Sequence, residues 1–213
     1  MRSRCSGSRA GAALGGLLAA ALVLGGCGGT PPAGDNRGAA GREAAVPPQV
    51  LTDFERAAAA MAAGEAEEAE VRFRDFLARH PGYPGVHVNL AILAAGRGDD
   101  AAAEHHVAAA LALDPASAPA LNQLGMLRRR QGRFEEAEAA YLKAVTAAPE
   151  YPLAHYNLGV LNELYLQRLE RALRSYERYL ELGGSDERVD RWIADLKRRI
   201  GAAESTADAR GAR

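Results

Sequence analysis

The middle of this sequence repeats with a period of 34 residues. Prolines, glycines and alanines each recur at that spacing through three units, and a further series of small residues continues into a fourth. The series are Pro81, Pro115 and Pro149; Gly64, Gly98 and Gly132; Ala69, Ala103 and Ala137; and Ala57, Ala91, Gly125 and Gly159. A fixed period of this length is typical of helix–turn–helix arrays, in which each unit buries its apolar face against the next unit. The period therefore predicts an all-α fold, an α-solenoid.

Each series has a physical role in such a unit. Glycine at the mid-unit turn permits a positive φ where the first helix stops, and the small residues let the paired helices approach closely. Proline ends the second helix because it lacks a donor and clashes with the preceding turn. The period predicts four units, at residues 50–83, 84–117, 118–151 and 152–184. Leu166 replaces the glycine in the fourth unit, and Ala172 comes one residue late, which predicts a longer turn there.

The clearest unit, residues 118–151, resembles the tetratricopeptide repeat. Seven residues fall on that family's signature positions: Leu121, Leu124, Gly125, Ala137, Tyr141, Ala144 and Pro149. The resemblance implies paired helices, with the first helix of each pair on an inner, concave face. Residues 185–200 are predicted to form a capping helix with Ser185 as its N-cap, and residues 201–213 a disordered tail.

The N-terminus has the pattern of an export signal. Arg2, Arg4 and Arg9 precede an apolar run, residues 10–24, made only of Ala, Gly, Leu and Val. The stretch that ends in Cys27, Leu-Gly-Gly-Cys, resembles a bacterial lipobox, which implies cleavage after residue 26 and a lipid on Cys27. An ordinary signal peptide with a chance cysteine is the alternative. Residues 27–49, rich in Gly, Pro and Ala, are predicted to tether the folded part to the membrane.

The signal also predicts where the protein resides, and the charge balance limits the kind of partner. Gly28 after the lipidated cysteine implies, by resemblance to Gram-negative lipoproteins, an outer-membrane anchor that faces the periplasm. The chain has 26 basic and 27 acidic residues, so no basic excess indicates a nucleic-acid partner. Cys5 would leave with the signal, so we expect no disulfide in the mature chain.

No catalytic motif is present in the sequence. It lacks GxSxG, a phosphate loop, HExxH and CxxC. His105 and His106 are adjacent, and side chains one residue apart on a helix point about 100° apart, so they are poorly placed to share a metal. His87 and His155 hold equivalent repeat positions, where packing explains them better than metal binding. We therefore predict a protein that is not an enzyme and needs no cofactor or metal.

The strongest candidate for function is a series of amides. Asn89, Gln123 and Asn157 hold one position in three successive first helices. An amide both donates and accepts hydrogen bonds, so it can hold the backbone of an extended peptide. The series is similar to the asparagine ladder of some peptide-binding tetratricopeptide proteins. The alternative is that these amides only solvate the groove or bridge neighbouring helices.

Further side chains are predicted to face the same groove by helical spacing. Arg128–Arg130 are either helix-end cations or an anchor for an acidic group of a partner. The groove lacks the lysine pair of carboxylate-clamp members, so an acidic chain terminus is a disfavoured ligand. Besides the three ladder amides, the predicted partner-binding residues are Phe54, Val88, Ile92, Asn122, Met126, Arg129, Arg130, Tyr156 and Val160.

These features predict a membrane-anchored scaffold of the bacterial envelope that binds a protein or an extended peptide segment. The C-terminal part, residues 155–196, is similar to tetratricopeptide proteins of TonB-type energy-transduction systems. Two alternatives stay open: a pilus or secretion assembly factor, and a docking accessory of an envelope enzyme such as a cell-wall hydrolase.

Overall fold

The computed structural model describes residues 47–211, and the side chains of residues up to 205. The predicted signal peptide, Cys27 and nearly all of the tether lie outside the described residues. Helix α1 begins at Pro48, two residues inside the predicted tether, because proline fits the first helical turn, where its missing N–H would be unpaired anyway.

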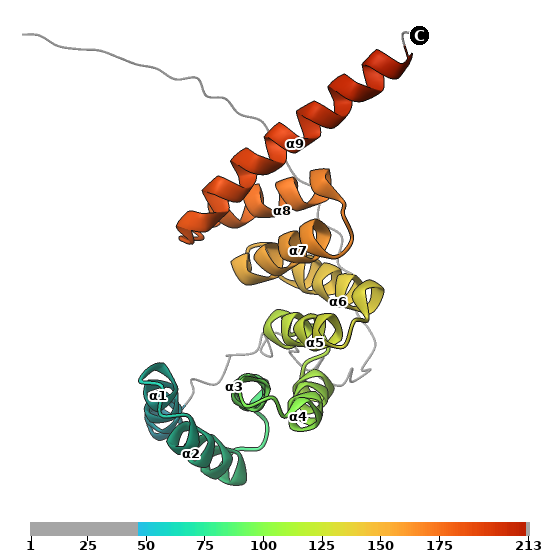
Figure 1. Cartoon of the computed structure of the whole chain (residues 1–213). Coiled ribbons are helices and arrows are strands. Elements are labelled where there is room, and N and C mark those ends of the chain that lie inside the picture. The colour runs from blue at the N-terminus through green and yellow to red at the C-terminus, as the bar shows by residue number, and fades with distance from the viewer. Residues whose placement is uncertain (1–46, 212–213) are drawn as a thin grey trace, which may run out of the picture. The chain divides into compact units, whose positions relative to one another are not determined.

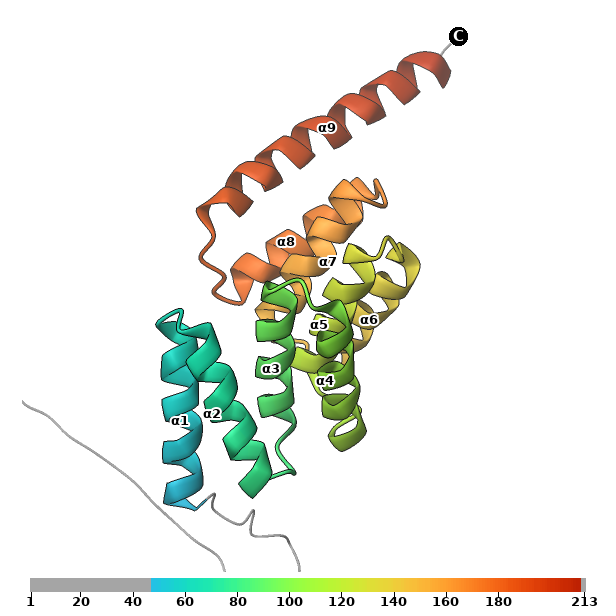
Figure 2. The same cartoon turned by 60° about the horizontal axis from the view of Figure 1, so that its bottom comes forward.

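The described residues form nine helices and no strand, arranged as four successive pairs followed by the single helix α9 (Figures 1 and 2). Neighbouring helices pack in chain order, and α5 also packs against both α3 and α7. This arrangement confirms the predicted all-α repeat solenoid. The helices are α1 (Pro48–Ala62), α2 (Ala66–Arg79), α3 (Pro84–Gly96), α4 (Asp100–Leu113), α5 (Ala118–Arg130), α6 (Phe134–Ala147), α7 (Pro152–Leu164), α8 (Leu169–Glu181) and α9 (Glu187–Gly211).

The mid-unit turns follow the periodic glycines. Gly64, Gly98 and Gly132 have φ values of 79°, 80° and 75°, a region that side chains with a Cβ rarely enter. The fourth turn spans residues 165–168, one residue more than the turn at 131–133. Gln167 takes the positive φ there, at 55°, and its amide donates to the Glu163 carbonyl at 3.0 Å. The longer fourth turn is therefore confirmed.

Small residues on the first helices face large ones on the second. A Cβ added to Gly125 would lie 2.4 Å from the ring of Tyr141, and one added to Gly159 would lie 2.6 Å from the ring of Tyr176. In the first two units alanine replaces glycine and the opposing residue is smaller than tyrosine. These pairs share a core cluster: Ala57 with Phe73, and Ala91 with Val107. The periodic small residues thus match the size of the side chain that they face.

The last helix differs from the prediction. It begins at Glu187, and Asp186, not Ser185, accepts a hydrogen bond from the Arg188 amide at 3.0 Å. The helix continues to Gly211, so the predicted disordered tail is wrong for residues 201–211. Residues 201–205 are all exposed, and Figures 1 and 2 show the end of α9 running on past α8. Extending a helix that is already formed costs little for alanine-rich sequence.

Candidate partner-binding site

The candidate site is the row of first helices, because the predicted partner-binding residues all lie on α1, α3, α5 and α7. The structure does not place them all on an open surface. Val88 is only 5% exposed and packs with Ala110 and Ala120, so the prediction that Val88 lines an open groove is wrong. Helix α3 turns the Val88 side chain towards neighbouring helices, and Ala110 and Ala120 occupy the space around it. Ile92 is half-buried beside the same cluster.

The first unit offers an apolar hollow of about 260 Å³. Phe54 lines it together with Leu51 of α1, Phe76 of α2 and Tyr83, which precedes α3. The Phe54 ring packs at 6.0 Å from Phe73 and 6.1 Å from Phe76, centroid to centroid, so its position is fixed. Leu51 is 51% exposed at the edge of the hollow. A preformed apolar hollow with an exposed aliphatic side chain at its edge can bind an apolar side chain of a partner.

The amide series divides into two kinds of residue. Asn89 and Gln123 are half-buried on α3 and α5, and no hydrogen bond within the described residues engages their side chains. Asn157 is only 7% exposed, and its Nδ2 donates to Oδ1 of Asn122 at 3.0 Å. Asn122 is itself 1% exposed. Asn157 and Asn122 therefore bridge α5 and α7, which is the alternative arrangement that the sequence left open.

The C-terminal helix covers the inner residues of the fourth unit. The Tyr156 ring lies 6.1 Å from Trp192 of α9 and 5.3 Å from Tyr179 of α8, centroid to centroid. Val160 packs against the same cluster. Burial raises the pKa of the Tyr156 hydroxyl above its ordinary value. Tyr156 thus contacts α9, Val160 packs into the cluster that α8 and α9 form, and the open part of the row consists of α1, α3 and α5.

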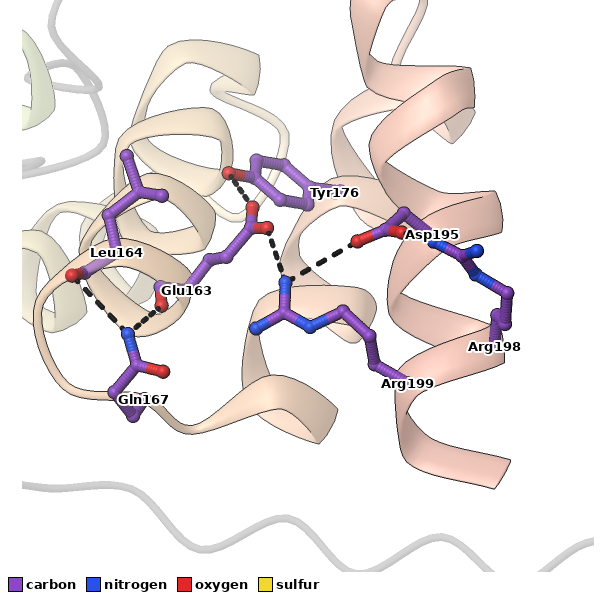
Figure 3. Close-up of polar contacts among 7 residues, drawn as sticks. All are labelled: Glu163, Leu164, Gln167, Tyr176, Asp195, Arg198 and Arg199. Atoms are coloured by element: carbon purple, nitrogen blue, oxygen red, sulfur yellow. Dashed lines mark hydrogen bonds and ion pairs between the residues drawn. The ribbon is translucent and has the colours of Figure 1, made fainter. Parts of the chain in front are cut away.

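A polar network, shown in Figure 3, holds α9 in this position. The Glu163 carboxylate of α7 accepts from the Tyr176 hydroxyl at 3.1 Å and from Arg199 of α9 at 3.2 Å. Arg199 also reaches Asp195 at 3.5 Å. Burial, and then the negative charge of Glu163, raise the pKa of Tyr176, so this hydroxyl stays a donor. Glu163 was not predicted from the sequence, although it lies one period after Arg129 and so holds the same repeat position.

The arginines at the end of α5 have different surroundings. Arg130 donates to the Ala95 carbonyl at 2.9 Å and pairs with Asp100 at 2.8 Å, so it joins α5 to the preceding unit. Arg129 lies over the Tyr165 ring, 5.9 Å from the centroid, and no ion pair within the described residues engages it. Arg128 pairs with Glu104, so of the three arginines predicted as an anchor, Arg129 is the one that no ion pair within the described residues engages.

Two histidines meet between α3 and α4. Nδ1 of His87 and Nδ1 of His106 lie 3.2 Å apart, so one ring donates to the other. Burial lowers the pKa of both rings. Within residues 47–211 no group of three or more metal-ligating side chains is assembled, and no helix is long and apolar enough to cross a membrane.

Comparisons with known proteins agree on the type of repeat. Models of the tetratricopeptide repeat match residues 60–127 and 122–187. The chain is similar to the type IV pilus assembly protein PilF of Pseudomonas aeruginosa strain PAO1, with 30% identity over 135 residues. This match covers 62% of the chain and 53% of that protein, so the chain spans about half the length of that curated relative.

Solved structures give the same result. The structure from the functional characterisation of Pseudomonas aeruginosa PilF matches with a TM-score of 0.64 and 26% identity, over 72% of this chain and 69% of that one. The first tetratricopeptide domain of Spaghetti (RPAP3), bound to the HSP90 peptide SRMEEVD, matches with a TM-score of 0.52 and 21% identity. That match covers 55% of this chain and 95% of the other, and it shows the fold alone.

Proposed function

Since this chain belongs to the tetratricopeptide repeat family, we propose that it is a lipid-anchored scaffold that assembles a pilus-type machine in the bacterial envelope. Repeats of this family form protein–protein interaction scaffolds, and a lipid anchor and a pilus-type machine would give this scaffold its place and its partners. Its work is binding rather than catalysis.

One observation carries the proposal: the likeness to a type IV pilus assembly protein in both sequence and structure. Identity is 30% in the sequence match and 26% in the structural one, and both matches extend over most of this chain. The lipobox-like segment that ends in Cys27 supports the same setting, because a lipid would hold the array at the membrane from which an envelope machine is built.

The partner segment docks on the open part of the first-helix row. The hollow beside Phe54 takes an apolar side chain, and the free amides of Asn89 and Gln123 hold the backbone of the segment. Arg129 supplies a positive charge at the far end of the open part. An apolar anchor flanked by amides gives affinity through burial and register through hydrogen bonds.

The test is genetic and uses the natural host. Deleting the gene should reduce the number of surface pili, and the wild-type gene should restore it. Cys27→Ser should block processing and release the chain from the membrane fraction, because a stable anchor requires the acyl chains. A Phe54→Asp variant that is still folded and membrane-bound should fail to restore pili.

Other outcomes would favour other systems. A deletion strain with a normal number of pili contradicts the proposal. Loss of TonB-dependent uptake in that strain would point to the transport system predicted from the C-terminal sequence. A defect in cell-wall hydrolysis would point to the docking accessory. Normal cleavage and membrane fractionation of the Cys27→Ser variant would refute the lipid anchor but not the role in pilus assembly.

A further inference from the structure

A second recess lies away from the first-helix row, between α6 and α8. We name it the α6–α8 groove; its volume is about 360 Å³. Leu142 and Val145 of α6 and Leu158 of α7 supply apolar surface, and α8 supplies arginines. Leu142 is 46% exposed. None of the predicted partner-binding residues lines this groove.

The arginines are Arg171, Arg174 and Arg178, three and four residues apart on α8. Residues at this spacing share one face of a helix, at a rise of about 1.5 Å per residue. Arg171 forms an ion pair with Glu138 at 3.1 Å, and Glu138 also forms an ion pair with Arg168 at 2.6 Å.

The other two guanidinium groups remain open to a ligand. Within the described part of the chain Arg178 pairs with Glu181 alone, at 3.0 Å, in a surface pair one turn along the same helix. For Arg174, no ion pair exists within the described residues. Among the side chains that line the groove, Glu138 has the one carboxylate, against the guanidinium groups of three arginines.

This positive excess is local, because the whole chain has a net charge of −1. Like charges three or four residues apart on a helix destabilise it. Cations gathered around an apolar recess therefore indicate a ligand that supplies both carboxylates and an apolar group. Guanidinium groups bind carboxylates in a two-pronged geometry that fixes direction as well as charge.

The spacing favours an extended peptide. Arg174 and Arg178 are about 6 Å apart along the helix axis at the ordinary rise per residue. Side chains on one side of an extended strand are about 6.6 Å apart. Two carboxylates two residues apart can therefore each reach one guanidinium, while a neighbouring apolar side chain enters the recess. A flat anionic lipid surface would meet the arginines but leave the recess empty.

We propose that the α6–α8 groove binds an extended acidic segment of a partner protein, with carboxylates at alternate positions. The groove shares no residue with the docking surface on α1, α3 and α5, so a scaffold with both can hold two partners at once. The proposal does not depend on which envelope machine the protein serves.

The test is fluorescence anisotropy with the purified chain and a short fluorescein-labelled peptide of alternating Glu and Leu. We expect saturable binding at low salt that weakens as salt screens the charges. The Arg174→Ala/Arg178→Ala variant should bind at least about tenfold more weakly, because each charge-assisted bond contributes about that factor. Both side chains are exposed or half-buried on α8, so the melting temperature should be unchanged.

Matched controls separate this site from general charge effects. Arg191 is an exposed arginine on α9. The Arg191→Ala variant also loses one positive charge, but its affinity for the peptide should stay within about twofold of the wild-type value. Glu138→Gln should tighten binding, because it removes the carboxylate that competes for Arg171. Phe54→Asp should leave this peptide affinity unchanged, which distinguishes the groove from the docking surface of the proposed function.

Several results would overturn the proposal. Equal binding by the double arginine variant, or equal binding of a peptide with Gln in place of Glu, removes the charge argument. Absence of saturable binding at low salt removes the site. Sedimentation with vesicles that contain phosphatidylglycerol, lost in the double variant, would assign the arginines to a lipid surface. A dimer that dissociates in the double variant would assign the groove to a second copy of the chain.

Discussion

Gly125→Ala tests the size matching on which each helix pair depends. Ordinarily alanine stabilises a helix interior by about 1 kcal/mol relative to glycine. Here the new Cβ would lie 2.4, 2.6 and 2.8 Å from three ring carbons of Tyr141. That ring is fully buried against Leu158 and Leu161, so it cannot move aside. Overpacking costs about 1–3 kcal/mol, and three contacts under 3.0 Å with a buried ring place this site at the upper end, about 3 kcal/mol. After the helix gain of about 1 kcal/mol, we expect a net loss of about 2 kcal/mol.

The assay is urea unfolding followed by circular dichroism, with thermal melting alongside. A loss of 2 kcal/mol corresponds to a fall of about 4–8 °C in Tm for a domain of this size. Gly96→Ala is the control, because a Cβ at Gly96 meets nothing within 4 Å. That variant should be neutral or gain up to about 1 kcal/mol.

A compensating change makes the test specific. The second unit pairs Ala91 with Val107, so valine leaves room for the alanine Cβ. Tyr141→Val alone should cost about 3 kcal/mol through the cavity that it leaves. The double variant Gly125→Ala/Tyr141→Val should be no less stable than Tyr141→Val, a coupling of about 2 kcal/mol. Additive losses would refute the size-matching argument.

Three further predictions concern single contacts. The free energy of unfolding should fall as the pH drops below about 6.5, because burial lowers the pKa of His87 and His106, so the unfolded chain binds protons more readily than the folded one. The His87→Gln/His106→Gln variant should flatten the pH dependence of Tm, and an unchanged pH dependence would contradict this cause. Tyr141→Phe should be neutral or stabilising by up to about 1 kcal/mol, because its buried hydroxyl has no hydrogen-bond partner among the described residues and burial raises its pKa to about 12. A clear loss of stability in urea unfolding would show that the hydroxyl is bonded. Arg199→Ala should speed amide hydrogen exchange in α9 while costing at most about 1 kcal/mol overall, and unchanged exchange would mean that apolar packing alone holds this helix.

The sequence period predicted the repeat, its turns and its tight contacts, because these features recur at fixed spacing. The glycines with positive φ and the small residues opposite Tyr141 and Tyr176 follow from backbone and packing rules that act within one unit. Even the exception could be predicted, because Leu166 breaks the glycine series and the fourth turn is longer by one residue.

The candidate site was harder to predict because it depends on contacts between units. The 34-residue period aligns Asn157 with Gln123, but Asn157 bonds to Asn122, 35 residues away. Neighbouring first helices meet at adjacent repeat positions rather than identical ones, and a periodic pattern does not show this offset. Val88 was misplaced for the same reason.

The position of α9 was the second source of error. Residues 185–200 were predicted to form a capping helix, and the apolar residues Val189 and Leu196 are buried as expected of one. The spacing did not indicate that Trp192 would contact Tyr156, or that Arg199 would reach Glu163. A cap of this kind shortens the open row of first helices, which leaves fewer positions for a partner than the number of repeats suggests.

Site-specific photocrosslinking in living cells can show whether a partner segment docks on the open part of the first-helix row. A photoreactive amino acid would replace Asn89 or Gln123, with exposed Leu113 of α4 as the control position. We expect one component of a pilus assembly machine, identified by mass spectrometry, to crosslink at both inner positions and not at Leu113. Crosslinks only at Leu113, or at none of the three positions in piliated cells, would contradict it.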